Sequence, residues 1–179
     1  ILVHGKRLHG KILHFMRHGI AMLPTNRKEK SVIPDQSILE NLSIARHALE
    51  RGHPIVSRRK EIQRYTRHRE ALQIKAPDCD APILSLSGGN QQKVFLARCL
   101  DTEADVLLLD NPTQGVDVGA KEEIYRMILA FAEAGKTILL NTLEIPEIMK
   151  VSDRCAVFFE GRIVRMFEHD EINEHDVML

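Results

Sequence analysis

The sequence is poor in the features that mark several large classes of protein. Its three cysteines, Cys79, Cys99 and Cys155, share no close spacing, which argues against a disulfide framework or a zinc site and favours a reducing compartment. No apolar run approaches the roughly 18 residues that a membrane-spanning helix needs, and no signal-peptide pattern opens the chain. Basic and acidic residues number 25 each, so the net charge points to neither nucleic acid nor an anionic membrane.

The composition is that of an ordinary globular protein, with 44% apolar and 28% charged residues among 179. This length suffices for one domain, or for a domain with a small subdomain. One stretch is strongly basic, and a solvated helix face is its usual explanation. Nucleic-acid binding is the alternative, although Tyr65 is the only aromatic residue interleaved with the charges. The basic residues are Arg51, Arg58, Arg59, Lys60, Arg64, Arg67 and Arg69.

Short strands and helices alternate in the second half of the chain. Residues 104–110 predict a buried strand, and a helix follows that Asp117 caps and Gly135 ends. This alternation predicts a largely parallel sheet covered by helices. The further elements expected are a strand at 136–142, a short helix at 144–151, two strands at 154–160 and 162–168, and a terminal helix at 169–178.

The first half has a different pattern. Strand-like pieces at 1–5 and 19–24 flank a possible helix near 9–18, and residues 35–76 are mostly helical in pattern. Two apolar stripes at helical spacing support the helices: Ile38, Leu42 and Ala45 form the first, and Ile62, Tyr65 and Leu72 form the second.

A small, glycine-containing loop precedes the helix predicted within "LSLSGGNQQKVFLARCL", residues 84–100. Backbone amides at a helix N-terminus, together with the helix dipole, form an anion site. Gly88 and Gly89 allow a phosphate to approach the backbone, and the Ser87 hydroxyl adds a donor. For an isolated Ser-Gly-Gly, a simple turn into a helix is the more common explanation.

A second motif, "LLLDNPTQGVDVGAK" at residues 107–121, places an acid at the end of the predicted strand. The carboxylate of Asp110 suits a Mg²⁺ shell, although a strand-end cap is the simpler role for an isolated aspartate. The next residue is Asn111, whose amide can orient a water molecule but cannot take its proton.

Taken in order, "LSGGNQQKV", "LLLDNPTQGVDVGAK", "SDR" and "EGRIV" resemble the nucleotide-binding domain of ATP-binding-cassette (ABC) transporters. The tails "NQQKV" and "GVDVGAK" are more narrowly similar to the ATP-binding subunit of bacterial importers for ribose, xylose, galactose and related sugars. The segments "GIAMLPTNRK" at 19–28 and "SILENLSIA" at 37–45 resemble the second domain of that subunit. The resemblance covers essentially the whole chain. It implies an α/β, P-loop NTPase-like fold: a parallel sheet flanked by helices, with a helical subdomain.

The resemblance also implies how the chain is divided. Residues 1–33 would be a remnant of the N-terminal strands. Residues 34–100 would be a helical subdomain that ends in the signature motif, LSGGNQQ, and the helix that contains it. Residues 101–179 would be the α/β core with Walker B, D-loop and switch region. The sequence has no "GxxxxGK[ST]" phosphate loop. In the family this loop precedes the segment where the chain begins, so we expect a chain truncated at its N-terminus that binds ATP poorly alone.

In the family, each ATP lies between the phosphate loop and Walker B of one domain and the signature of another. To its own site this chain would bring Asp110 for Mg²⁺, but three positions depart from the family. Asn111 stands at the usual Glu position, Thr25 at the Q-loop position and Leu143 at the switch position. We therefore expect slow hydrolysis, or none, at this site. The signature half offered to a partner site matches the family at Ser87, Gly88, Gly89, Asn90, Gln91 and Asp117.

The resemblance implies ATP and Mg²⁺ as cofactors of the complete protein, which would be an ABC-type ATPase on the cytoplasmic face of the cell membrane. The implied partners are a first nucleotide-binding domain of the same subunit or a second copy, transmembrane permease subunits and, indirectly, a periplasmic or extracellular sugar-binding protein, with no nucleic acid. Two alternatives stay open. The first is a regulatory pseudo-ATPase domain that binds nucleotide without turnover, and the second is a cassette ATPase that acts on nucleic acid or ribosomes.

Overall fold

The computed structural model describes residues 2–3, 5–25, 31–50 and 56–178. The chain forms two compact units, residues 1–140 and residues 141–179. No helix in the described part of the chain is long and apolar enough to cross a membrane. The resemblance implied a division by function, with boundaries after residues 33 and 100. That division differs from these two compact units and stays a prediction. Arg51 of the basic stretch and residues 26–28 of the first resemblance segment lie outside the described residues.

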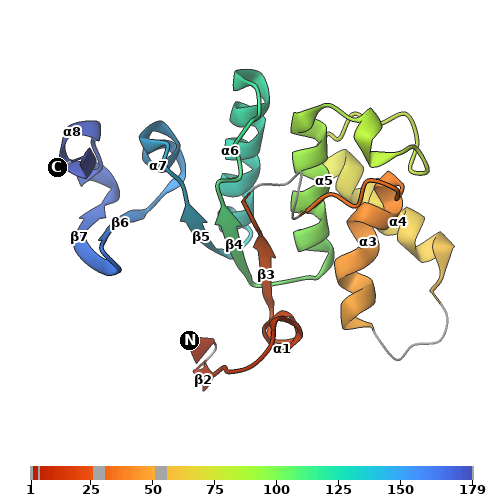
Figure 1. Ribbon diagram of the computed structural model, residues 1–179, viewed down its shortest axis with the longest axis horizontal. Helices are drawn as coiled ribbons and strands as arrows, with labels where there is room; N and C mark the ends of the chain where they lie inside the picture. The colour runs from red at the N-terminus through yellow and green to blue at the C-terminus, as the bar shows by residue number, and fades with distance from the viewer. Residues whose placement is uncertain (1, 4, 26–30, 51–55, 179) are drawn as a thin grey trace. The chain divides into compact units, whose positions relative to one another are not determined.

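A three-stranded sheet lies in the first unit (Figure 1). Its strands, in spatial order, are β3 (Ile20–Leu23), β4 (Val106–Asp110) and β5 (Thr137–Asn141). Strands β3 and β4 run parallel, with Leu23 opposite Leu109. Leu107 and Leu109 are both buried, because alternate side chains of a strand point to the same face. The predicted α/β fold with a parallel sheet is confirmed.

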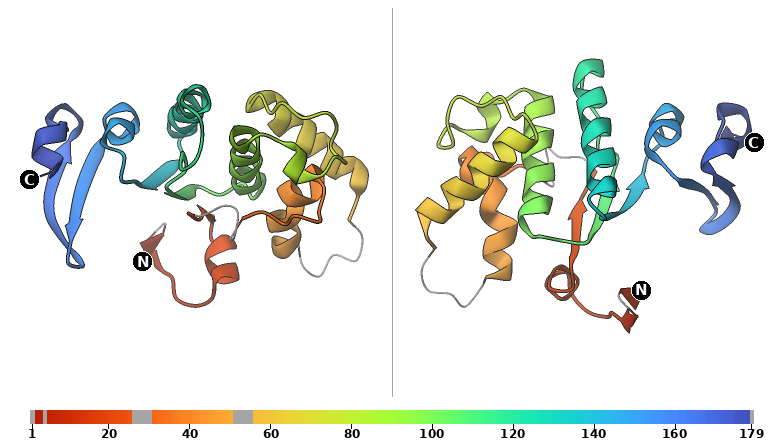
Figure 2. Two further views of the ribbon diagram at one scale, coloured as in Figure 1. Left: turned by 45° about the horizontal axis from the view of Figure 1, so that its top comes forward. Right: turned by 180° about the vertical axis from the view of Figure 1, so that it is seen from behind.

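The long helices of the first unit are α3 (Ile38–Leu49), α4 (Arg58–Ala71), α5 (Gly88–Asp101) and α6 (Val118–Glu133). Helices α3, α4 and α5 pack together, and α6 lies beside α5 (Figure 2). Local signals set where several of them begin. Ser37 forms a capping box with Glu40 at the start of α3, and Asp117 caps α6 as predicted.

Only part of the second predicted apolar stripe is buried in the structure. Tyr65 and Leu72 of the second stripe are buried, but Ile62 is exposed. The buried face of α4 runs through Tyr65 and His68, and Ile62 lies at the edge of that face. Because Tyr65 is buried, the one aromatic residue that favoured nucleic-acid binding is not available to stack on a base.

Part of the basic stretch is used inside the fold. Arg64 Nε lies 3.1 Å from Oδ1 of Asp101, whose side chain is buried at the end of α5. His68 Nε2 lies 3.3 Å from the same oxygen, whereas the ion pair of Arg58 with Asp80 lies on the exposed surface. These contacts favour the interpretation of α4 as a helix that uses some of its charges for packing and presents the others to solvent.

A second polar network joins α3 to α5. The Arg98 guanidinium donates to the backbone oxygens of Asn41, at 2.5 Å, and Ser31, at 2.8 Å. Burial lowers the pKa of Arg98 to about 10, which still leaves the group protonated at neutral pH. The buried Asn41 side chain in turn donates to the backbone oxygens of Ile33, Gln36 and Ser37.

The N-terminal elements are shorter than predicted. Strands β1 (Leu2–Val3) and β2 (Lys6–Arg7) form an antiparallel ribbon, and helix α1 (Ile12–Met16) follows in place of a helix over 9–18. Gly10 has a φ of 129°, which a right-handed helix cannot contain, so the helix begins after it. A single 3₁₀ turn, η1 (Ile83–Ser85), precedes α5.

The second unit is built around an antiparallel hairpin. It contains α7 (Ile145–Val151), β6 (Arg154–Phe159), β7 (Arg162–Glu168), η2 (His169–Glu171) and α8 (Glu174–Met178). The hairpin turns at Glu160 and Gly161, both with positive φ, as predicted for Gly161. Its small core contains Cys155, Phe167 and Ile172.

The prediction of one continuous terminal helix over 169–178 was wrong. The chain forms a 3₁₀ turn and then a separate short helix. The Asn173 side chain accepts a hydrogen bond from the Asp176 amide at 2.9 Å, and this local cap starts a new helix at Glu174. Ile172, between the two pieces, is anchored in the core of the unit.

Candidate functional site

The carboxyl ends of β3 and β4 bring Thr25 beside Asp110. The Thr25 amide donates to Asp110 Oδ2 at 3.3 Å, and Asn111 Nδ2 lies 3.3 Å from Asp110 Oδ1. Parallel strands end at the same edge of a sheet, which explains how residues distant in sequence meet here. We call Thr25, Asp110, Asn111 and Gln114 the sheet-edge cluster.

Gln114 is the member of this cluster that sequence reasoning missed. Its Oε1 accepts a hydrogen bond from the Thr25 hydroxyl at 3.0 Å. Its backbone amide donates to the Asn111 oxygen at 3.1 Å, which folds the loop back over the strand end. The turn sequence Pro-Thr-Gln-Gly predicts a loop here, but no local signal indicates that the amide contacts Thr25.

The backbone of Asn111 adopts the left-handed conformation, with a φ of 47°. Asparagine enters this region more readily than most residues, so the position suits an amide side chain. Its location places that amide directly against the Asp110 carboxylate.

The one carboxylate of this cluster, Asp110, suits a metal ion, and the other three members are neutral. Mg²⁺ in proteins commonly binds one or two carboxylates together with phosphate oxygens and water, so Asp110 fits a Mg²⁺ ion that arrives with a nucleotide. Nowhere in the described ranges do three His, Cys, Asp or Glu side chains gather as a metal site. The hydroxyl of Thr25 and the amides of Asn111 and Gln114 are neutral, and none of them is a base at neutral pH.

Leu143, at the predicted switch position, belongs to the second unit. The residue is 92% exposed. A leucine side chain has no hydrogen-bonding group to offer a phosphate.

The residues predicted to form the signature surround the N-terminal end of α5. The Ser87 hydroxyl accepts hydrogen bonds from the Asn90 amide at 3.4 Å and from Asn90 Nδ2 at 3.0 Å. Gln91 Nε2 donates to the Leu86 oxygen at 3.0 Å. Ser87 itself is exposed, so the positive end of a 14-residue helix faces solvent. Such an end favours an approaching anion.

Gly89 brings α5 into close contact with α6. A Cβ atom at Gly89 would lie 2.7 Å from the Ala120 Cβ and 3.8 Å from Asp117 Oδ2. The Asp117 carboxylate caps α6 by accepting from the Ala120 amide at 3.0 Å. The structure therefore places the N-terminal ends of α5 and α6 together, with Ser87, Gly88, Gly89, Asn90 and Gln91 on one helix and Asp117 on the other.

We expect Gly89→Ala to destabilise the first unit by about 1 to 3 kcal/mol, because the added methyl group overlaps Ala120. Chemical denaturation of the chain measures this loss. Gly119→Ala is the matched control, since a Cβ there would meet only Asp117 Oδ1 at an ordinary 3.5 Å. Adding Ala120→Gly should recover part of the loss. Equal stabilities of the two glycine variants would show that the close contact is unimportant.

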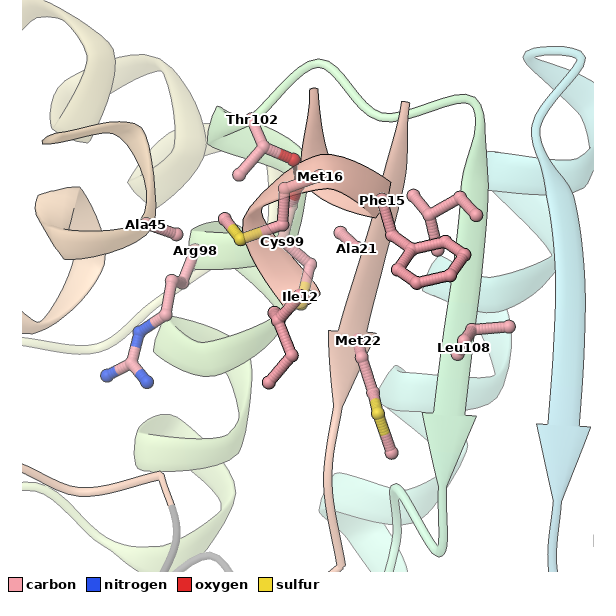
Figure 3. Close-up of a pocket in the computed structure, with 11 residues that line it drawn as sticks. Ile12, Phe15, Met16, Ala21, Met22, Ala45, Arg98, Cys99, Thr102 and Leu108 are labelled. Atoms are coloured by element: carbon pink, nitrogen blue, oxygen red, sulfur yellow. Dashed lines mark hydrogen bonds between the residues drawn. The ribbon is translucent and has the colours of Figure 1, made fainter. Parts of the chain in front are cut away.

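A groove of about 270 Å³ near α1, β3 and α5 differs from the sheet-edge cluster and the α5 helix end because most of the residues that line it are apolar (Figure 3). Burial raises the pKa of Cys99 to about 12, so its thiol stays protonated at neutral pH. Among the described residues that line the groove, Arg98 is the one with a charged side chain, and its guanidinium is already engaged by backbone oxygens. This lining does not suit a phosphate. Its residues are Ile12, Phe15, Met16, Ile20, Ala21, Met22, Ala45, Arg98, Cys99, Thr102 and Leu108.

Comparison with known proteins identifies related sequences. The sequence pattern of the ABC transporter family matches residues 1–114, more than half of the chain. The chain is 42% identical over 164 residues to the ribose import ATP-binding protein RbsA of Hahella chejuensis, covering 91% of this chain and 33% of the relative. It is 46% identical over 151 residues to the arabinose import ATP-binding protein AraG 2 of Burkholderia ambifaria, covering 84% and 29%. The chain thus spans about a third of the length of these relatives.

Solved structures share the fold. The ATP-binding cassette MJ0796, in a dimeric post-hydrolysis state bound to ADP and Pi, superimposes with a TM-score of 0.78 at 21% identity, covering 94% of this chain and 72% of that chain. CbiO1 of Clostridium perfringens, part of the ABC transporter complex cbiONQ, gives 0.77 at 22% identity, covering 99% and 68%. The sequence pattern and the shared fold agree, and the chain belongs to the ABC transporter family.

Proposed function

We propose that this chain is an energy-coupling nucleotide-binding domain of an ATP-driven sugar importer, in which its two candidate half-sites have different roles. The end of α5 donates the LSGGNQQ signature to the ATP site of a partner domain, while the chain's own Walker B site is degenerate. The observation that carries this proposal is the contrast between the exposed, Ser87-capped helix end beside Asp117 and the sheet-edge cluster, in which a neutral amide, Asn111, stands beside the carboxylate that would hold Mg²⁺. The names of the ribose and arabinose import relatives support a sugar as the transported substrate.

At the chain's own site, the carboxylate of Asp110 would hold Mg²⁺. The Thr25 amide and the Asn111 side chain orient this carboxylate, one at each oxygen. A bound Mg²⁺ would neutralise part of the phosphate charge. The neutral side chains around Asp110 can position a water molecule, but none of them can accept its proton. Hydrolysis at this site is therefore slow or absent.

At the partner's site, the chain contributes groups that favour an anion. The helix end supplies a positive dipole, and Gly88, which is partly exposed, carries no side chain that would cover the backbone there. The Ser87 oxygen accepts from Asn90, so its own proton is directed to another acceptor, for which a phosphate oxygen is suited. This is stabilisation of charge by preorganised donors, which requires no base on this chain.

The proposed assembly includes the partners that such a role requires. They are a first nucleotide-binding domain of the same subunit or a second copy, transmembrane permease subunits at the cytoplasmic membrane face and, indirectly, a sugar-binding protein. The relatives are about three times as long as this chain, which is compatible with a further nucleotide-binding domain in each. The segments 1–33, 34–100 and 101–179 would then be the strand remnant, the helical subdomain and the core of this domain.

The degenerate site is tested by Asn111→Gly in the full-length subunit with its membrane partners. Glycine tolerates the positive φ of this residue, so the change removes the amide without straining the backbone. We expect steady-state ATP hydrolysis to stay within about twofold of the unmodified protein. A loss of about tenfold or more would mean that this site is a working one, and the assignment of roles would be reversed.

A further inference from the structure

Helices α5 and α6 meet at two points, one helical turn apart on each helix. They lie side by side in every view (Figures 1 and 2). The first point is the close approach of Gly89 to Ala120. The second is an ion pair in which Lys93 Nζ lies 2.5 Å from Glu123 Oε2. Residues four apart on α5 thus contact residues three apart on α6, which is the spacing of one face of each helix.

Lys93 is unusual for a lysine because its side chain is only 3% exposed. Its ammonium group also donates to the backbone oxygen of Gln73 at 3.1 Å. Gln73 lies just after α4 and has a φ of 50°, which turns the chain there. Lys93 therefore joins α5 to α6 and to the segment that follows α4, all within the first unit.

The contact with Lys93 also changes the pKa of Glu123. The hydrogen bond from Lys93 lowers the pKa of Glu123 below its usual value, in agreement with the short distance between the charged groups. Glu123 is charged at neutral pH, and Lys93 has no other acidic partner within ion-pair distance among the described residues.

The lysine end of this ion pair is buried, while the Glu123 end is half-exposed. Such a pair is weak evidence for stability, because removing a charge from water offsets much of the attraction. Its better-supported use is to specify one packing arrangement among several. The contact of Gly89 with Ala120 sets how closely the helices approach, but a single contact between two small residues offers few ridges and grooves to restrict a shift along the axis. The ion pair adds this restriction, since a shift along the axis would separate the charges.

We propose that Lys93 and Glu123 are positioning residues that fix the N-terminal end of α5 against that of α6. Ser87 and Asp117 then reach the partner's ATP site as one surface of defined geometry. Neither Lys93 nor Glu123 touches the nucleotide in this arrangement. The inference rests on the proposed function, because it assigns a role to the surface that donates the signature.

The geometric part is tested on the chain itself with two spin labels. Cysteines replace the exposed Leu84, before α5, and Val118, at the start of α6, in a Cys79→Ser background. Pulsed electron paramagnetic resonance then reports the distribution of distances between the labels. We expect one narrow distribution, a broader or shifted one for Lys93→Met, and a return to the narrow one for Lys93→Arg, which keeps the charge.

A control variant and a second variant of the ion pair accompany Lys93→Met. Lys60→Met removes an exposed lysine from α4 and should leave the distribution unchanged. If Lys93→Met fails to fold by circular dichroism, Glu123→Gln is the second variant, since it removes the charge from the more exposed partner. An unchanged distribution in a folded variant that lacks the ion pair overturns the positioning role.

The functional part uses ATP hydrolysis by the full-length subunit with its membrane partners. We expect Lys93→Met to lower kcat about tenfold with little change in KM for ATP, because nucleotide contacts are made by other residues. Ser87→Asp in the same preparation separates the two proposals. If Ser87→Asp abolishes turnover but Lys93→Met changes neither kcat nor the distances, only the positioning role fails. If Ser87→Asp has no effect, the proposed function fails.

Discussion

Ser87→Asp is expected to lower ATP turnover by the full-length subunit and its membrane partners by about 100-fold or more, a magnitude typical of removing one preorganised donor from a charged site. Aspartate is as good a helix cap as serine, so α5 should keep its start and its packing. The substitution replaces a hydroxyl donor with a negative charge at the point where a phosphate would approach. Steady-state hydrolysis with the permease present measures the effect.

Ser87→Asn is the matched control for this prediction. Asparagine also caps helices well, is neutral and keeps a hydrogen-bond donor in its amide group, so most of the turnover should remain. Circular dichroism should show that both variants fold like the unmodified protein. If Ser87→Asp is harmless and Asn111→Gly is damaging, the working site is the chain's own sheet-edge cluster. If neither change alters turnover, the regulatory pseudo-ATPase alternative is favoured.

Arg98→Met is expected to destabilise the first unit by about 3 kcal/mol, the loss typical of breaking a buried hydrogen-bond network. Methionine fills much of the space of the arginine stem but cannot donate to the backbone oxygens of Asn41 and Ser31. It also removes the cation that lies 4.9 Å from the centre of the Phe95 ring. Urea denaturation of the chain gives the change in the free energy of unfolding.

Arg67→Met provides the control for the loss of an arginine as such. Arg67 is exposed on α4, and its replacement should change the stability by no more than about 0.5 kcal/mol. Arg98→Lys should fall between the two, because a lysine keeps the charge but cannot reach both backbone oxygens with a planar fork. Similar losses for Arg98→Met and Arg67→Met would show that the network between α3 and α5 adds little.

The strands and helices could largely be predicted because their signals are local. The apolar run that becomes β4, the Asp117 cap of α6 and the turn at Gly161 each depend on a few neighbouring residues. The split of the terminal helix was missed even though its cause, the Asn173 cap, is also local.

The motifs predicted the members of the candidate site except Gln114, but they did not predict which residues contact one another. The Thr25 amide bonds to a carboxylate 85 residues later, and the Thr25 hydroxyl to Gln114, 89 residues later. Nothing in the sequence around either residue selects the other. Only the parallel alignment of β3 with β4 brings the two strand ends together.

By itself the sequence determined the family motifs, the element types and the absence of a base after Asp110, because these follow from residue identity and short-range spacing. The tertiary structure alone decided that Gln114 belongs to the sheet edge, that Arg98 is buried against Asn41, and that Lys93 joins α5 to α6. These contacts depend on burial and on helix packing across long sequence separations. A polar residue in a one-dimensional pattern looks the same whether it faces solvent or a partner from another element.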